Sequence, residues 1–172
     1  LFRSGESVFF VASGNVGQKG EVVIGNLLQA NTVVTRTWIG YLSAMCLVER
    51  YSSIVVCDNE SVKFIDIQTG RVCRDIPFNK GITAVAADMY GISLFIGFND
   101  GRILMAHLPD LKEVQEIGRH QCKPKGGNIF KSVAMSNYYA VNKLQVLWLE
   151  KEFQPEIYSC SNDGSLIQRS II

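Results

Sequence analysis

The sequence has little net charge and no long hydrophobic run, and these absences exclude several classes of protein. Its 172 residues hold 17 Lys and Arg against 16 Asp and Glu, so the formal net charge is only +1. With so small a net charge, overall electrostatic attraction gives no reason to expect binding to nucleic acid or to a membrane surface. No apolar run approaches the roughly 18 residues of a membrane-spanning helix. With 19% charged and 47% hydrophobic residues, disorder is excluded, and one globular domain with a large buried core is expected.

Cysteine is sparse and is not arranged in pairs. The count is odd and no two cysteines form a CxxC motif. A disulfide framework needs even numbers and a secreted context, so we expect buried, reduced thiols and an intracellular protein, cytoplasmic or nuclear. The chain also starts at Leu1-Phe2 without Met or a signal-peptide-like segment, which predicts a piece of something longer. The cysteines are Cys46, Cys57, Cys73, Cys122 and Cys160.

What the chain does contain is short apolar runs rich in Val, Ile and aromatic residues. Examples are 7–13, 53–57 and 93–97, each bounded by small or polar residues. No window keeps a helical stripe for three turns, so the fold class is all-β. Asn99-Asp100-Gly101 and Asn162-Asp163-Gly164 have the composition of tight hairpin turns.

These turns recur with a period. The residues that precede comparable strands are Gly20, Glu60, Gly101 and Gly164, at intervals of 40, 41 and 63 residues. The long third interval equals one period plus an insertion. Four short strands in about 40–45 residues are typical of a β-propeller blade.

Two segments resemble the WD40 repeat family. In 61–70, Ile65-Asp66 stands where Trp-Asp usually ends a repeat, and 162–167 is similar to the S-x-D-G-x-[IV] element. The resemblance implies a WD40-like β-propeller segment of about four partial blades. No Gly-His dipeptide exists, and Arg169-Ser170 occupies the Trp-Asp position of the last unit. The Asp–His–Ser/Thr–Trp network of the family is therefore not expected in any unit.

The chain divides into four units with an insertion before the last. Unit one is expected to lack an innermost strand and unit four an outer strand, so further residues or a second copy would complete the ring. We favour a loop insertion over 119–143 followed by an inner strand at 144–149. The alternative, that 132–149 forms a blade of its own, stays open. The units are 1–40, 41–80, 81–118 and 144–172.

Candidate chemistry is sparse. His120 and Cys122 form a His-x-Cys, but no second pair joins them and structural zinc needs four ligands. The glycine-rich segment 14–20 departs from the P-loop pattern and is expected to join two strands. No nucleophile elbow or carboxylate pair occurs. The prediction is no metal, no cofactor and no enzymatic activity.

The expected insertion carries the most informative segment, 119–131, which has four basic residues, an aromatic residue and no acid. It could bind an acidic peptide or phosphate, contact RNA by stacking, or be an ordinary solvated loop. The leading hypothesis, which the resemblance implies, is a non-enzymatic protein–protein interaction scaffold. The alternatives are nucleic-acid binding through this segment and oligomerisation through open blade edges. The candidate partner-binding residues are Arg119, Lys123, Lys125, Phe130 and Lys131.

Overall fold

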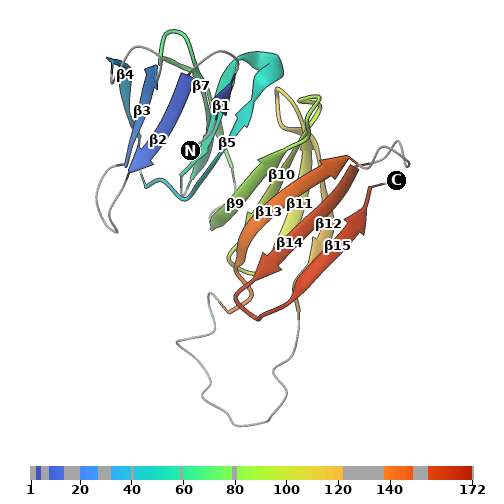
Figure 1. Ribbon diagram of the computed structural model, residues 1–172. Helices are drawn as coiled ribbons and strands as arrows, with labels where there is room; N and C mark the ends of the chain where they lie inside the picture. The colour runs from blue at the N-terminus through green and yellow to red at the C-terminus, as the bar shows by residue number, and fades with distance from the viewer. Residues whose placement is uncertain are drawn as a thin grey trace. The chain divides into compact units, whose positions relative to one another are not determined.

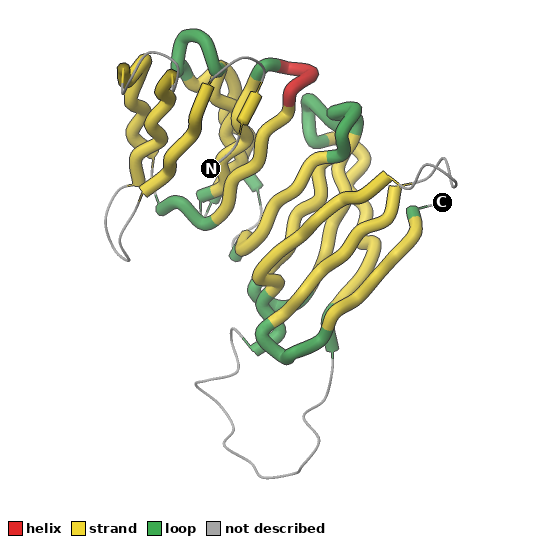
Figure 2. The backbone as a smooth tube through the Cα atoms, in the orientation of Figure 1, coloured by secondary structure: helices red, strands yellow, loops and turns green. Residues whose placement is uncertain are grey.

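A computed structural model gives the arrangement of the strands (Figure 1). It describes residues 3–4, 8–13, 20–26, 32–39, 41–58, 60–78, 81–121, 138–148 and 155–171. Among these residues strands dominate and no α-helix occurs; a single 3-10 turn covers Glu49–Tyr51, drawn red in Figure 2. The all-β prediction is confirmed.

The strands form four antiparallel sheets, here called blades 1 to 4 in chain order. Within each sheet, strands follow one another as they do in the sequence. Blade 1 contains β1 (Arg3–Ser4), β2 (Val8–Ser13), β3 (Gly20–Asn26) and β4 (Thr32–Ile39). Blade 2 contains β5 (Ala44–Val48), β6 (Ser53–Cys57), β7 (Ser61–Asp66) and β8 (Val72–Pro77). Blade 3 contains β9 (Ile82–Ala87), β10 (Ser93–Phe98), β11 (Arg102–His107) and β12 (Lys112–Arg119). Blade 4 contains β13 (Val141–Trp148), β14 (Pro155–Ser161) and β15 (Leu166–Ser170).

This meander of three- and four-stranded sheets is the predicted WD40-like pattern of partial blades, with three corrections to strand positions. Blade 1 does have a strand in the innermost place, because β1 pairs with β2. Blade 3 extends further than expected, because β12 continues to Arg119. In blade 4, β13 starts at Val141, three residues before the inner strand that the sequence predicts at 144–149, and it pairs with β14.

The predicted hairpin turns are confirmed. Gly101 and Gly164 have φ values of +88° and +79°, a conformation that strains residues with a Cβ atom. They connect β10 to β11 and β14 to β15, which pair in antiparallel register. β2 and β3, on either side of the glycine-rich segment, also form an antiparallel pair.

The chain separates into two compact parts, Leu1–Lys80 and Gly81–Ile172. The division falls where the sequence places the boundary between units two and three, although the unit boundaries themselves stay a prediction. In the N-terminal part, Val22 and Ile24 of β3 pack with Ile54, Val56 and other buried residues of blade 2. This core joins blades 1 and 2.

The C-terminal part has a core of its own, between blades 3 and 4. Phe95 and Ile103 of blade 3 pack with Val141, Leu144 and Ile157 of blade 4. A Cβ atom on Gly97 of β10 would lie 2.7 Å from the Val141 Cβ, so the glycine permits this close approach. Thr83 Oγ1 also donates a hydrogen bond to the Val141 carbonyl, at 2.8 Å. The two sheets are therefore joined face to face.

The cysteine prediction is correct in part. Cys46, Cys57, Cys73 and Cys160 are free thiols. Cys46 and Cys57 are buried, and burial raises the pKa of the Cys57 thiol well above its ordinary value. Cys73 is exposed because it lies on β8, the outer strand of blade 2, so the prediction of a buried thiol is wrong there. Cys122 lies outside the described residues.

Candidate functional site

Of the five candidate partner-binding residues, the structure describes only Arg119. It is the last residue of β12 rather than part of a loop, and its position in the sheet is opposite Arg102. Its Nε lies 3.1 Å from the Glu116 Oε1, and Nη2 donates to Oε2 of the same carboxylate. The other four candidates, which the sequence expects beside it in one basic segment, lie outside the described residues: Lys123, Lys125, Phe130 and Lys131.

The next residue, His120, is fully buried and anchors blade 3 to blade 4. Its Nδ1 lies 2.6 Å from the Ser165 Oγ, and its Nε2 lies 2.9 Å from the Ser159 Oγ. Asp163, in the turn between β14 and β15, accepts hydrogen bonds from the backbone N–H of Ser165, at 2.8 Å, and from the Ser165 hydroxyl. Histidine, serine and aspartate thus form one connected network.

The expectation that no unit holds the complete family network stands, but most of that network is present in the described part of blade 4. Asp163, His120 and Ser159 supply three of the four residue types of the family network, while Arg169 stands where the family has Trp. The Gly-His dipeptide of the family does not predict this histidine, because the chain has Gly118-Arg119-His120. The sequence feature that indicates this network is a histidine that directly follows a strand and lies two residues after a glycine.

The environment of His120 favours the neutral ring. Burial lowers the pKa of His120, and the nearby Arg169 charge lowers it further, against an opposing effect of Asp163. Since both ring nitrogens are engaged by serine hydroxyls, the residue has no nitrogen to offer a metal. Within the described ranges no three His, Cys, Asp or Glu side chains are grouped as metal ligands.

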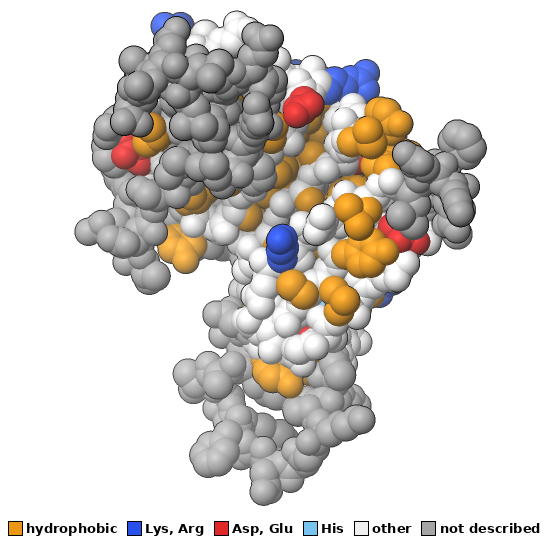
Figure 3. Space-filling model, in the orientation of Figure 1, with side chains coloured by type: hydrophobic (Ala, Val, Ile, Leu, Met, Phe, Trp, Pro, Cys, Tyr) orange, Lys and Arg blue, Asp and Glu red, His pale blue; other side chains and the backbone are white. Residues whose placement is uncertain are grey.

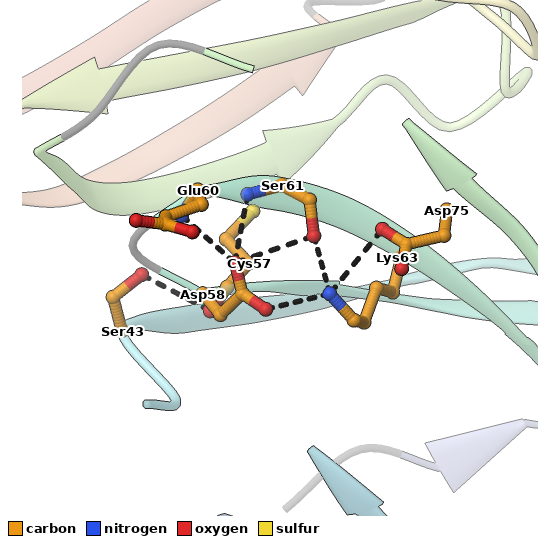
Figure 4. A network of polar contacts seen from close by, with 7 residues as sticks. All are labelled: Ser43, Cys57, Asp58, Glu60, Ser61, Lys63 and Asp75. Atoms are coloured by element: carbon orange, nitrogen blue, oxygen red, sulfur yellow. Dashed lines mark hydrogen bonds and ion pairs between the residues drawn. The ribbon is translucent and has the colours of Figure 1, made fainter. Parts of the chain in front are cut away.

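A second polar network fixes the turn between β6 and β7 (Figure 4). The Asp58 Oδ1 accepts the N–H groups of Glu60, at 2.8 Å, and Ser61, at 2.7 Å, and its Oδ2 lies 2.6 Å from the Lys63 Nζ. Burial alone would raise the pKa of Asp58, but Lys63 and the two amides outweigh it and hold the pKa below the ordinary value. Asp75 lies 3.2 Å from the other side of Lys63. The Lys63 ammonium is thus paired with the carboxylates of Asp58 and Asp75. We conclude that this network stabilises the turn and is not a binding site.

One turn presents hydrophobic side chains to solvent. Between β9 and β10, Met89, Tyr90 and Ile92 are 66%, 49% and 47% exposed. The buried Asp88 carboxylate accepts hydrogen bonds from the backbone N–H groups of Tyr90 and Ile92 and thereby fixes the turn. The Tyr90 ring packs edge-to-face on Trp148 at the end of β13, with 4.7 Å between ring centroids. In Figure 3, hydrophobic side chains reach the surface at several places on the C-terminal part. We call Met89, Tyr90, Ile92 and Trp148 the apolar turn cluster.

A hollow of about 470 Å³ opens between β12 of blade 3 and β15 of blade 4. One wall carries Met105, Gln115 and Ile117, and the other carries Arg169, Ser170 and Ile171. The Arg169 guanidinium lies against Gly118, where an added Cβ would be only 2.3 Å from its Nε. That Nε is buried, and it has no hydrogen-bond partner.

Comparison with known proteins adds information on the fold. No family model matches the chain, and no curated protein matches its sequence. Among solved structures, Sqt1 of Saccharomyces cerevisiae, a WD40 protein, superimposes with a TM-score of 0.63 at 12% identity. The fold is WD40-like. The match covers 96% of this chain but only 41% of Sqt1.

The WD40-like blades also match a computationally designed protein, Ika4, with a TM-score of 0.58 at 17% identity. This match covers 100% of this chain and 96% of Ika4. At such identities the likeness concerns the fold alone. The described residues form WD40-like sheets with turns fixed by hydrogen bonds, an apolar turn cluster that is largely exposed, and a hollow between β12 and β15. These are features suited to binding another molecule.

Proposed function

We propose that the chain is a non-enzymatic interaction scaffold that presents the turns and loops of its WD40-like blades to a protein or peptide partner. The apolar turn cluster is the observation that carries this proposal. Exposed hydrophobic groups gathered beside a polar surface are typical of protein interaction sites. Here the hydrophobic side chains lie on a turn whose backbone is fixed by hydrogen bonds to the Asp88 carboxylate. The turn therefore loses little conformational entropy when a partner binds.

The basic segment 119–131 is a second proposed contact surface. Arg119, Lys123, Lys125, Phe130 and Lys131 match the chemistry of an acidic peptide partner. Arg119 is paired with Glu116, which weighs equally against an acidic peptide and a nucleic acid at this one position. Four free thiols fit a reducing compartment, where we place the protein. The structure describes no helix with the length and apolar character of a membrane span.

The proposal is tested by affinity capture on the immobilised chain, with bound proteins identified by mass spectrometry. The Met89→Asp/Ile92→Asp variant should lose the partners of the apolar turn cluster. The matched control, Val72→Asp/Val114→Asp, changes side chains that are 41% and 47% exposed on outer strands β8 and β12, and it should keep those partners. Circular dichroism verifies the fold of each variant.

The basic segment is tested in the same experiment. A variant with four basic residues of the segment changed to Glu should lose acidic partners, while the same charge change at four exposed basic residues elsewhere should not. Capture that neither the apolar nor the basic variant reduces would overturn the proposal. The first set is Arg119, Lys123, Lys125 and Lys131, and the control set is Arg71, Arg74, Lys112 and Lys143.

A further inference from the structure

The turn that carries most of the apolar turn cluster is joined to a second turn of blade 3. The turn between β9 and β10 and the turn between β11 and β12 lie at the same end of this sheet, because its strands are antiparallel and follow chain order (Figure 1). A backbone hydrogen bond of 2.8 Å from the Leu108 N–H to the Ile92 carbonyl links the two turns. The adjacent residues Ser93 and His107 stand directly opposite each other. The two turns therefore form one continuous surface.

The second turn brings an exposed carboxylate to this surface. Glu113, the second residue of β12, has a φ of +53°, and the pairing of β11 with β12 shifts register between Met105 and His107. Such a bulge redirects side chains, and here the Glu113 Oε2 lies 3.4 Å from the His107 Nε2, with the Glu113 side chain 80% exposed. An imidazole compensates a carboxylate only when it is protonated. Beside a neutral His107, the Glu113 charge is therefore available to a partner.

This carboxylate and the aromatic pair of the cluster lie on the same side of blade 3. Met105 of β11 packs against the core shared with blade 4, and His107 lies two residues further along the same strand. Because side chains alternate between the faces of a sheet, His107 also faces blade 4. The Tyr90 ring does so as well, since it packs on Trp148 of β13. A partner at this end of the sheet can therefore contact both groups.

The spacing of the apolar and charged groups suits one short segment. Ile92 directly precedes β10, and Glu113 lies on β12, two strands away. Neighbouring strands are about 4.8 Å apart, so about 10 Å separates the two positions along the sheet. About three residues of an extended chain span this distance.

The charged residues of the two turns favour a basic partner. Residues 88–93 and 107–113 contain three carboxylates and one lysine. Asp88 is buried and accepts hydrogen bonds from backbone N–H groups, and Asp110 lies 3.6 Å from Lys112. The exposed charge at Glu113 is negative, which complements a lysine or arginine and repels an acidic segment.

We propose that these two turns together bind a segment of a partner protein that combines apolar side chains with a lysine or arginine. The apolar side chains contact Met89 and Ile92, and the cation reaches the Glu113 carboxylate. The inference rests on the proposed scaffold function and adds to it the class of partner. Burial of apolar surface supplies affinity, and the charge at Glu113 selects basic segments over acidic ones.

The first test selects peptides from a random library displayed on phage. The full chain is immobilised at mildly alkaline pH, where free imidazole is neutral. Selected peptides should combine apolar residues with Lys or Arg within about four positions, whereas those selected on Glu113→Lys should carry Asp or Glu instead. Glu49→Lys, the same change at an exposed residue of the N-terminal part, is the matched control and should select the wild-type pattern. The proposal is wrong if no peptide is enriched, or if basic residues are enriched equally on Glu113→Lys.

A second test measures how the selected peptide binds. In fluorescence anisotropy its affinity for Glu113→Lys should be about three- to tenfold lower than for the wild type. Met89→Ser/Ile92→Ser, which removes the apolar side chains without adding charge, should abolish binding. Added salt should weaken binding to the wild type and have little effect on binding to Glu113→Gln.

Hydrogen exchange locates the bound peptide on the chain. Amides in 88–93 and 107–113 should gain protection when the selected peptide is present. Protection confined to other parts of the chain would contradict the proposed site.

The two proposals can fail separately. If Met89→Asp/Ile92→Asp loses captured partners while Glu113→Lys retains them and selects the same peptides as the wild type, the basic-partner inference is wrong and the scaffold function stands. If selected peptides require both Glu113 and the apolar side chains while capture is unaffected by the apolar and basic variants, the two turns bind peptides and the proposed scaffold function is wrong.

Discussion

At the scale of single residues, His120 shows how a polar side chain can be essential to a hydrophobic interface. It is fully buried and hydrogen-bonded to two serines of blade 4. A buried polar group without a partner costs free energy, so the histidine and both serines depend on one another. Arg102 and Arg119, by contrast, form ion pairs on exposed side chains, where such pairs contribute little to stability.

We predict that His120 makes the stability of the fold depend on pH. Its pKa is lowered in the folded state, so as the pH falls below about 6.5 the unfolded chain takes up a proton that the folded chain resists. The contribution is fully present above that pH and is lost as the pH falls through the folded-state pKa. Urea unfolding from about pH 8 to about pH 5 measures it.

The variant His120→Gln should flatten this pH dependence. It should also lower the free energy of unfolding by about 1–3 kcal/mol at neutral pH, because a serine hydroxyl loses its partner. His107→Gln is the matched control, since His107 is the other histidine and is 43% exposed. Identical pH slopes for the wild type and His120→Gln would contradict the assignment.

At the scale of elements, a single glycine decides how closely β10 approaches β13. An added Cβ on Gly97 would lie 2.7 Å from both Cβ and Cγ1 of Val141, which is closer than real side-chain contacts. The backbone conformation does not require glycine here, because Gly97 does not have a positive φ. The requirement comes from the neighbouring blade.

We predict that Gly97→Ala lowers the free energy of unfolding by about 1–3 kcal/mol through overpacking. Val141→Ala removes Cγ1 and Cγ2 but keeps the Cβ at 2.7 Å, so it relieves part of the clash. The double variant should therefore be more stable than the sum of the two single changes predicts. A double-mutant cycle by chemical denaturation measures this coupling, expected at about 0.5–3 kcal/mol.

Gly164→Ala is the control for that cycle. Gly164 has a positive φ, so alanine is strained there, yet no atom lies within 4 Å of the added Cβ. Its effect should therefore add to that of Val141→Ala without coupling. Strict additivity between Gly97→Ala and Val141→Ala would show that the close approach does not limit packing.

At the scale of the whole molecule, the two compact parts have separate cores. Repeat proteins of this kind owe their stability to each unit and to its contacts with the adjacent units. A lesion in one core is therefore expected to act mainly on its own part.

We predict that Phe95→Ala, in the core of the C-terminal part, costs about 3–5 kcal/mol. Hydrogen exchange should show lost protection mainly in β9–β11, β13 and β14. Ile54→Ala in the other core should cost about 2–5 kcal/mol and should act mainly on β3 and β5–β7. Loss of protection spread evenly over both parts in either variant would mean that they unfold as one cooperative unit.

Local sequence by itself determined the strands and the turns. Short apolar runs and their period of about 40 residues predicted the all-β blades, and Asn162-Asp163-Gly164 predicted its hairpin because only a glycine takes that conformation without strain. These signals are local: each depends on a few residues adjacent in the chain. The basic segment was also visible, although most of it lies outside the described residues.

Tertiary structure decided the features that join distant residues. His120 reaches Ser159 and Ser165 across the boundary of two blades, and the exposure of Cys73 follows from the place of β8 at the edge of its sheet. Burial and hydrogen bonding depend on which sheets pack together. The residue pattern of a single segment does not predict this packing.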